Sequence, residues 1–362
     1  MKKMLSLLLI LALLALTLSA CGSESAASPP SGPAPEVIHP SPPEEGDEIQ
    51  GLTPEVVPIF DPLDIAVGTL NGNTGVSVAW LMDQAEQGFT VDNYSFEIAT
   101  APDQIVSMLL SDQVQIAALP TNVAAMLYNR SEGAVQLAAI VAYGVLHVLE
   151  NGGYIELVED LLGRTIHTTG EGAGPEFILN HILTSHGLIP GEDVYIEFHA
   201  NEALAAQMAA GQIDLSMMPE PMVTSVLAQN EDVRRALDIT QEWDAVTDSP
   251  LVMSSVVVRR DFAEAHPEAV LRFLELLHMS IEETNANPQA AGELVAQFGI
   301  IPSARIAALA IPGCNLTFLA GAALEPAVIG YLQVLYSAYP ASIGGAIPSE
   351  NFYFIANHLF AR

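Results

Sequence analysis

Short apolar runs alternate with helical patterns along much of the chain. Residues 63–69 (LDIAVGT), 94–99 and 114–119 have the length and composition of strands, and residues 74–84 and 102–110 between them have a helical pattern. Strands that alternate with helices in this way are typical of a parallel or mixed α/β sheet. The pattern therefore predicts the α/β fold class.

Much of this pattern returns after 99 residues, without a gap. The positions that correspond are Gly75 and Gly174, Phe96 and Tyr195, Asp103 and Glu202, Val114 and Ile213, and Pro120 and Pro219. Because few residues are identical, this is either a structural repeat or two unrelated α/β units of similar spacing. We interpret it as two similar lobes.

A later segment, residues 267–285, has apolar positions at i, i+3, i+4 and i+7, which predicts an amphipathic helix packed back on the first lobe.

Four loops follow predicted strands, and we expect them to meet. They are residues 71–75, 120–122, 168–174 and 219–221. In open α/β sheets, ligands bind at the carboxyl ends of the strands, where glycines allow close approach and helix N-termini offer free N–H groups. The loops therefore predict one ligand cleft. Its candidate residues are Asn71, Asn73, Thr74, Gly75, Pro120, Thr121, Asn122, Tyr143, Thr169, Gly170, Gly172, Ala173 and Glu220.

Several of these candidates have a second interpretation. Thr121 and Asn122 either cap a helix or also contact ligand. Glu220 either accepts hydrogen bonds from an amine or is a structural residue of the hinge. Tyr143 ends a strand near the expected lobe crossing, where it could stack a heterocycle, and Trp243 lies in a polar segment from which it could close over the cleft.

Composition excludes several functions. The 362 residues are 50% hydrophobic, enough for more than one lobe, and carry a net charge of −32. A chain this acidic repels nucleic acid and anionic membrane surfaces, so we exclude both as ligands. Lys2 and Lys3 are the only lysines. A Walker A loop and a pyridoxal Schiff base both need a lysine, so neither can form downstream.

The sequence contains little evidence for a metal-binding site or for a catalytic nucleophile. His181 and His186 are five residues apart on a predicted helix and do not share a face, so we expect no metal site and no cofactor. No Gly-x-Ser-x-Gly motif occurs. Cys314 is predicted to be a buried core thiol.

The N-terminus has the features of an export signal. Residues 1–20 combine a basic start with an apolar stretch, and residues 21–58 are rich in Pro, Ser and Glu. Residues 18–21 (LSAC) resemble the bacterial lipoprotein box, which implies lipid attachment at Cys21; the alternatives are an ordinary signal peptide or a short membrane helix. Residues 21–58 are then a disordered tether to a membrane.

Segments throughout the body resemble one protein superfamily. The segments GTLNGNTGVSVAWLMDQA, APDQIVSMLLSDQVQIAALPTNVAAMLYNR and AAGQIDLSMMPEPMV are similar to those of ABC-importer solute-binding proteins in the thiamine-precursor, sulfonate, taurine and nitrate group. The resemblance covers roughly residues 62–340. It implies a type II periplasmic-binding-protein fold, with two Rossmann-like lobes joined by a two-strand hinge. The first lobe would comprise residues 59–147 and 251–362, and the second residues 148–250.

The resemblance leaves the ligand open. The first loop in this group often reads Gly-Pro-Thr-Gly, whereas here Asn73 replaces the proline. All nine arginines lie outside the four loops, so we expect a neutral, singly charged or zwitterionic solute. A thiamine-precursor pyrimidine leads narrowly. A sulfonate, taurine or nitrate remains the alternative, held by the helix N-termini near Thr74 or Ala173.

The functional prediction is a lipid-anchored receptor, not an enzyme. It would capture its solute by lobe closure and deliver it to a membrane permease with its ATPase. We expect a monomer on the outer face of the bacterial cytoplasmic membrane, at the cell surface or in a periplasm. The alternatives are a pyrimidine-forming enzyme on the same scaffold, which the missing lysines argue against, and a sensor or adhesive lipoprotein without a transport role.

Overall fold

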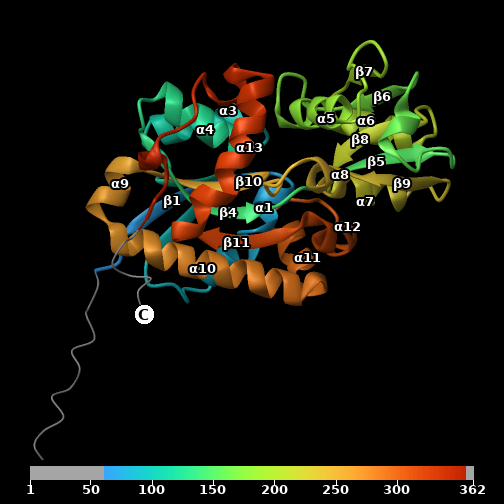
Figure 1. Ribbon diagram of the computed structural model, residues 1–362. Helices are drawn as coiled ribbons and strands as arrows, with labels where there is room; N and C mark the ends of the chain where they lie inside the picture. Colours follow the sequence, from blue (N-terminus) through green and yellow to red (C-terminus); the bar gives the residue numbers. More distant parts are fainter. Residues whose placement is uncertain (1–60, 356–362) are drawn as a thin grey trace, which may run out of the picture. The chain divides into compact units, whose positions relative to one another are not determined.

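Two mixed sheets organise the chain in the computed structural model, which describes residues 61–355 (Figure 1). The described elements belong to one compact unit, Ile59–Arg362. The predicted signal (residues 1–20), the tether (residues 21–58) and Cys21 lie outside the described residues. Within residues 61–355, none of the helices is both long enough and apolar enough to cross a membrane.

The first sheet has six strands in the order β11-β4-β10-β3-β1-β2. Strand β1 pairs parallel with β2 and β3, whereas β10 pairs antiparallel with β3 and β4, and β11 antiparallel with β4. The strands are β1 (Asp64–Leu70), β2 (Asn93–Ala99), β3 (Ile116–Pro120), β4 (Val135–Ala142), β10 (Ser254–Arg259) and β11 (Leu316–Ala320).

The second sheet has five strands in the order β7-β6-β8-β5-β9. It is built from the green and yellow middle of the chain, whereas the blue and red ends belong to the first sheet (Figure 1). Strand β6 pairs parallel with β7 and β8, and β5 pairs antiparallel with β8 and β9. The strands are β5 (Leu146–Asn151), β6 (Thr165–Thr168), β7 (Tyr195–Phe198), β8 (Leu215–Pro219) and β9 (Val233–Asp238).

Helices connect and cover these strands. The predicted amphipathic segment forms α10, whose stripe of Val270, Phe273, Leu274 and Leu277 is buried. The helices are α1 (Asn73–Val76), α2 (Ala79–Glu86), α3 (Pro102–Leu110), α4 (Thr121–Arg130), α5 (Gly174–Ser185), α6 (Asn201–Ala209), α7 (Met222–Leu227), α8 (Ile239–Val246), α9 (Arg260–Ala265), α10 (Pro267–Ala286), α11 (Pro288–Gln297), α12 (Ala304–Ala310) and α13 (Leu324–Ala338). Short 3₁₀ turns are Val158–Leu161, Ile311–Cys314, Gly321–Ala323, Pro340–Ile343 and Glu350–Phe352.

The predicted pair of similar lobes is confirmed. Strands β3 and β8 are 99 residues apart at both ends, and so are helices α3 and α6. Both sheets also contain the same strand order, β2-β1-β3-β10 in one and β7-β6-β8-β5 in the other. In each series the fourth strand is antiparallel to the third. The offset in the sequence therefore reflects a repeated topology.

The predicted helix over residues 74–84 is wrong as a single element, because it breaks at Ser77 into α1 and α2. The Ser280 hydroxyl of α10 donates to the Ser77 carbonyl at 2.8 Å, and the Leu81 N–H lies 3.2 Å from the same Ser280 oxygen. A side chain from a distant helix therefore takes the place of the helical bond between Leu81 and Ser77.

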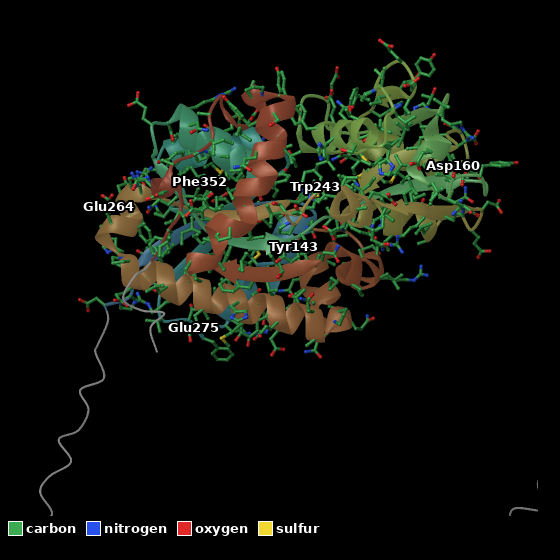
Figure 2. The ribbon with its side chains drawn as sticks, in the orientation of Figure 1. Tyr143, Asp160, Trp243, Glu264, Glu275 and Phe352 are labelled. Carbon is green, nitrogen blue, oxygen red and sulfur yellow. The ribbon has the colours of Figure 1, made fainter. Side chains whose placement is uncertain are left out.

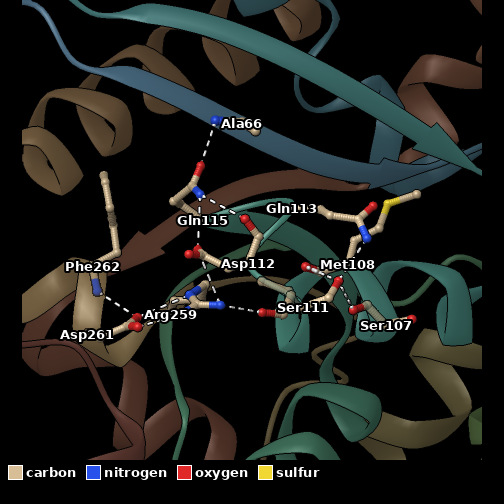
Figure 3. Close-up of polar contacts among 11 residues, drawn as sticks. Ala66, Ser107, Met108, Ser111, Asp112, Gln113, Gln115, Arg259, Asp261 and Phe262 are labelled. Atoms are coloured by element: carbon tan, nitrogen blue, oxygen red, sulfur yellow. Dashed lines mark hydrogen bonds and ion pairs between the residues drawn. The ribbon is translucent and has the colours of Figure 1, made fainter.

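A polar network ties the turn between α3 and β3 to neighbouring strands (Figure 3). The Arg259 guanidinium, at the end of β10, lies 3.3 Å from the Asp112 carboxylate and donates to the Leu109 carbonyl at 2.8 Å. Gln115 donates to Asp112 and accepts from the Ala66 N–H of β1. Strands β1, β3 and β10 are thus held together at this end of the sheet.

The chain passes between the sheets twice. Strand β4 ends at Ala142 and β5 begins at Leu146, so the first crossing is residues 143–145; helix α8 ends at Val246 and β10 begins at Ser254, so the second is residues 247–253. The predicted lobe limit after residue 147 falls two residues into β5, and the limit after residue 250 falls within the second crossing.

Trp243 packs at the second crossing. Its indole N–H donates to the Ser249 carbonyl at 2.7 Å, and its ring lies 5.8 Å from the Tyr331 ring of α13 and 5.2 Å from the His181 ring of α5. Trp243 is fully buried between helices that belong to different parts of the sequence. The structure thus places Trp243 in the interior, and its closing over a cleft, one of the possibilities that the sequence left open, stays a prediction. Figure 2 shows Trp243 and Tyr143 where the two sheets adjoin.

Two glycines allow the crossings to pack closely. A methyl group on Gly144 would overlap Thr240 and lie 2.8 Å from Leu251 Cδ2, and one on Gly330 of α13 would overlap Ser249.

Cys314 is predicted to be a core thiol. It is buried, and this burial raises the pKa of its thiol.

Gly330→Ala should destabilise the protein by about 1–3 kcal/mol, because the added methyl group overpacks α13 against the second crossing. Ser249→Gly in the same chain should restore most of the loss, since it removes both overlapping side-chain atoms. Urea denaturation of the two single variants and the double variant measures the coupling. Simple additivity of the two changes would contradict the close contact.

Candidate functional site

The four predicted loops follow β1, β3, β6 and β8, all at strand carboxyl ends. In the first loop, Gly72 has a φ of 85°, and Asn71 donates its N–H to the Ala99 carbonyl at 3.0 Å. A methyl group on Gly75 would lie 2.6 Å from the Leu70 carbonyl oxygen, so this turn requires glycine. The Thr74 hydroxyl donates to the same carbonyl at 3.3 Å. Glycine thus allows α1 to begin directly against the end of β1.

Loops from the two lobes face each other at two places. A methyl group placed on Gly174 would lie 3.6 Å from Asn122 Oδ1 and 3.8 Å from the Tyr331 hydroxyl. One placed on Gly72 would lie 3.9 Å from Pro221 Cδ. The second loop of lobe one therefore opposes the start of α5, and the first loop opposes the loop after β8. The structure brings all four predicted loops together in these two pairs.

Several buried polar atoms near these loops lack a hydrogen-bond partner among the described residues. Both amide atoms of Asn73 and the hydroxyl of Thr121 are in this state. So are the hydroxyls of Thr69, in β1, and Ser216, in β8. Nearly all buried polar groups in folded proteins are hydrogen-bonded, so these atoms need a partner such as a ligand or water. The side chain that departs from the usual Gly-Pro-Thr-Gly pattern, Asn73, offers both a donor and an acceptor.

The loop before α5 uses glycine and an acidic cap. Gly170 and Gly172 have φ values of 78° and 69°, and Ala173 is the N-cap residue and donates its N–H to the Gly170 carbonyl. The Gly172 N–H donates to the Glu176 carboxylate at 2.6 Å. Thr169, just before this turn, is buried. A carboxylate already occupies one N–H of this loop, which makes the loop less favourable for an anion.

Glu220 is part of an internal ion pair. The carboxylate is 1% exposed, accepts from Arg235 at 2.6 Å, and accepts from the Thr224 N–H and hydroxyl at 3.0 Å each. Both oxygens thus have protein partners, and a role in ligand binding stays a prediction. Sequence reasoning missed Arg235, because its strand β9 reaches β8 only through β5 in the strand order.

The remaining candidates flank the loops. Pro120 is the half-buried N-cap residue of α4, and the buried Thr121 donates its N–H to the Met253 carbonyl of the second crossing. Tyr143, in the first crossing, is half-buried and donates its N–H to the Asn315 carbonyl at 3.1 Å. A backbone hydrogen bond therefore joins the loop after β3 to the second crossing, and another joins the first crossing to the residue before β11.

A groove of about 1100 Å³ lies beside the loops, between α5, the start of the second crossing and α13. It shares only Glu171 and Gly172 with the predicted loop residues. Its charged and titratable lining is acidic, with Glu171, Glu176 and Asp248 beside His181, and no lysine or arginine lies among its described lining residues. The groove is therefore unsuited to a multiply charged anion.

His147 is a buried titratable group beside the first crossing. Burial lowers its pKa below the ordinary value, and Arg235 acts in the same direction, while Asp238 and Glu220 oppose it. The folded state thus favours neutral His147.

A family model supports this architecture. The model described as NMT1/THI5 like matches residues 85–291, more than half of the chain. This chain belongs to the NMT1/THI5-like family. No curated protein sequence matches it.

Solved structures with the same fold are distant in sequence. An ABC transporter structure from Parabacteroides distasonis has 21% identity and a TM-score of 0.69, over 81% of this chain and 99% of that one. The periplasmic aliphatic sulphonate-binding protein SsuA from Escherichia coli has 17% identity and a TM-score of 0.64, over 79% and 90%. The periplasmic nitrate-binding protein NrtA from Synechocystis PCC 6803 has 10% identity and a TM-score of 0.51, over 73% and 75%. The predicted two-lobed periplasmic-binding-protein fold is confirmed.

Stability should fall as the pH decreases from about 7 through the ordinary histidine pKa of about 6.5. Below that value the unfolded chain binds a proton at residue 147 that the folded chain disfavours, so the free energy of unfolding decreases. His147→Gln should reduce this dependence, measured as the difference in urea stability between pH 7.5 and pH 5. His278→Gln, on an exposed part of α10, is the control. An unchanged dependence in His147→Gln would contradict the assignment.

Proposed function

We propose that the protein is the lipid-anchored solute-binding component of an ABC import system and that it captures a small polar molecule by lobe closure. Opposed loops from two lobes suit this mechanism, because a ligand that contacts both lobes favours the closed state. The fold shared with an ABC transporter structure and with the sulphonate- and nitrate-binding proteins supports this proposal.

The observation that carries the proposal is the unpartnered amide of Asn73. Its donor and its acceptor are both buried, and the unpartnered Thr121 hydroxyl follows the adjacent strand β3. An aminopyrimidine presents an amino donor beside a ring-nitrogen acceptor, which an amide can bind through two hydrogen bonds. We therefore assign a thiamine-precursor pyrimidine as the solute, with Asn73 as the main polar contact. This choice also agrees with the acidic groove and with the Glu176 cap.

A sulfonate, taurine or nitrate is the second candidate. The N-terminus of α4 points to it, because helix N-termini favour anions, and two similar structures are described as sulphonate- and nitrate-binding proteins. In this case the Thr121 hydroxyl and the Asn73 amino group would both donate to the anion.

Asn73→Ala should weaken binding of a pyrimidine thiamine precursor roughly tenfold or more, because two hydrogen bonds to the ligand are lost. Calorimetry on the full chain in detergent would compare pyrimidine precursors, taurine, alkanesulfonates and nitrate. Asn93→Ala, at an exposed position on the edge strand β2, is the matched control. If only a sulfonate binds, the solute is the second candidate and not a pyrimidine. Binding of none of these solutes would overturn the ligand assignment.

Cys21→Ser should abolish incorporation of labelled fatty acid and release the protein from the membrane fraction. Two acyl chains on one cysteine are sufficient for stable anchoring, so their loss changes the location of the protein and not its fold. Cys314→Ser is the matched control, since that thiol is buried in the first lobe. Undiminished labelling of the Cys21→Ser variant would show that the anchor is elsewhere.

A further inference from the structure

Three potential metal ligands converge on one edge of the second sheet. His167 lies in β6, Glu197 lies opposite it in β7, and His199 follows β7. His167 Nδ1 is 2.9 Å from His199 Nε2 and 3.3 Å from Glu197 Oε2, and the three ligand atoms all lie within 4.8 Å of one another. His181 and His186, the histidines considered in the sequence, belong to no such group among the described residues.

Strand geometry explains why the three side chains meet. His167 and Glu197 are direct neighbours in the parallel pair β6–β7. His199 is two residues beyond Glu197, and its N–H donates to the Thr168 carbonyl at 2.9 Å, which extends the ladder. Residues two apart along a strand lie on the same face, so His199 and Glu197 share a face. The arrangement therefore depends on backbone pairing and not on mobile side chains alone.

The protein by itself does not satisfy these atoms well. His167 Nδ1 is the nearest partner of both the second imidazole and the carboxylate. If this nitrogen accepts a hydrogen bond from the His199 N–H, its lone pair is used and the carboxylate has no donor there. If it carries the proton, one N–H serves two acceptors. A cation at the centre would instead bind one lone pair from each of the three ligands.

The spacing is compatible with such a cation. Nitrogen and oxygen ligands lie about 2.0–2.2 Å from Zn²⁺, so two ligand atoms of a tetrahedral site are roughly 3.3 Å apart. The separations of 2.9 Å and 3.3 Å are close to this value. The Glu197 side chain is exposed and can adjust, whereas His167 is only 20% exposed.

We propose that His167, Glu197 and His199 form a binding site for one divalent transition-metal ion of the Zn²⁺ class. Two imidazoles and one carboxylate favour zinc, nickel or copper over calcium or magnesium, which prefer oxygen ligands. Three protein ligands leave one tetrahedral position for water. The ion fastens β7 to β6 directly before the loop of residues 169–174.

The site is confined to the second lobe. The cross-strand pair of the first lobe that corresponds to His167 and Glu197 is Gly68 and Glu97, and Ala99 lies two residues beyond Glu97, so the first lobe has the carboxylate but neither imidazole. The described residues also contain two simpler pairs, His186 with Glu159 at 2.9 Å and His278 with Glu282 at 3.4 Å. These pairs have one imidazole each and serve as internal controls.

Calorimetric titration of the full chain with Zn²⁺, purified without a polyhistidine tag, tests the proposal. We expect one ion per chain and a rise in Tm on addition of Zn²⁺. His167→Gln and His199→Gln should each weaken Zn²⁺ binding more than about tenfold. His186→Gln should leave it unchanged. The Tm of each variant without metal checks that the fold is retained.

A second probe identifies the ligand set. Co²⁺ bound in place of Zn²⁺ should give the visible absorption of a four-coordinate site, and His199→Gln should remove it. The proposal is wrong if the wild-type chain binds no Zn²⁺ at micromolar concentration. It is equally wrong if His186→Gln weakens binding as much as His167→Gln does. Neither result depends on the solute, so failure of the transport proposal is distinguishable from failure of this one.

Discussion

The burial of Trp243 at the second crossing is the contact on which the arrangement of the two lobes depends. Its indole N–H donates to the Ser249 carbonyl, and its ring packs against His181 of α5 and Tyr331 of α13. A large aromatic ring whose N–H is hydrogen-bonded buries a large apolar area. Its contacts also fix the angle at which the neighbouring helices meet. The close approaches at Gly144 and Gly330 have the same effect, because they leave no space between the crossings and their neighbours.

The buried polar groups near the proposed site are of two kinds. Some have hydrogen-bond partners in the protein, and others have none among the described residues. Glu220 is buried, but its oxygens are bonded to Arg235 and Thr224, so it contributes to the integrity of the second lobe. The amide atoms of Asn73 and the hydroxyl of Thr121 are buried without a partner among the described residues, so their desolvation is compensated only when a ligand or water binds. This difference favours the loop after β1 over the loop after β8 as the source of the main polar contact in the proposed site.

The two lobes share a topology but differ in chemistry. Where the second lobe has His167, Glu197 and His199, the strand register of the first lobe has Gly68, Glu97 and Ala99. The ladder between β6 and β7 is short, with four residue pairs, whereas β1 and β2 have seven. A metal ion at the shorter edge would supply a cross-strand link that hydrogen bonds supply in the first lobe.

The amino-acid pattern by itself determined the α/β class, the two lobes and the four loops, because strand and helix periodicity and glycine turns are local properties. It also placed α3 and α10 closely, where an apolar stripe and an N-terminal proline coincide. Only the tertiary structure decided the break at Ser77, the partner of Glu220, the burial of Trp243 and the meeting of His167 with His199. Each of these depends on which strands and helices become neighbours. That choice is made by the packing of the whole core, which no local pattern records.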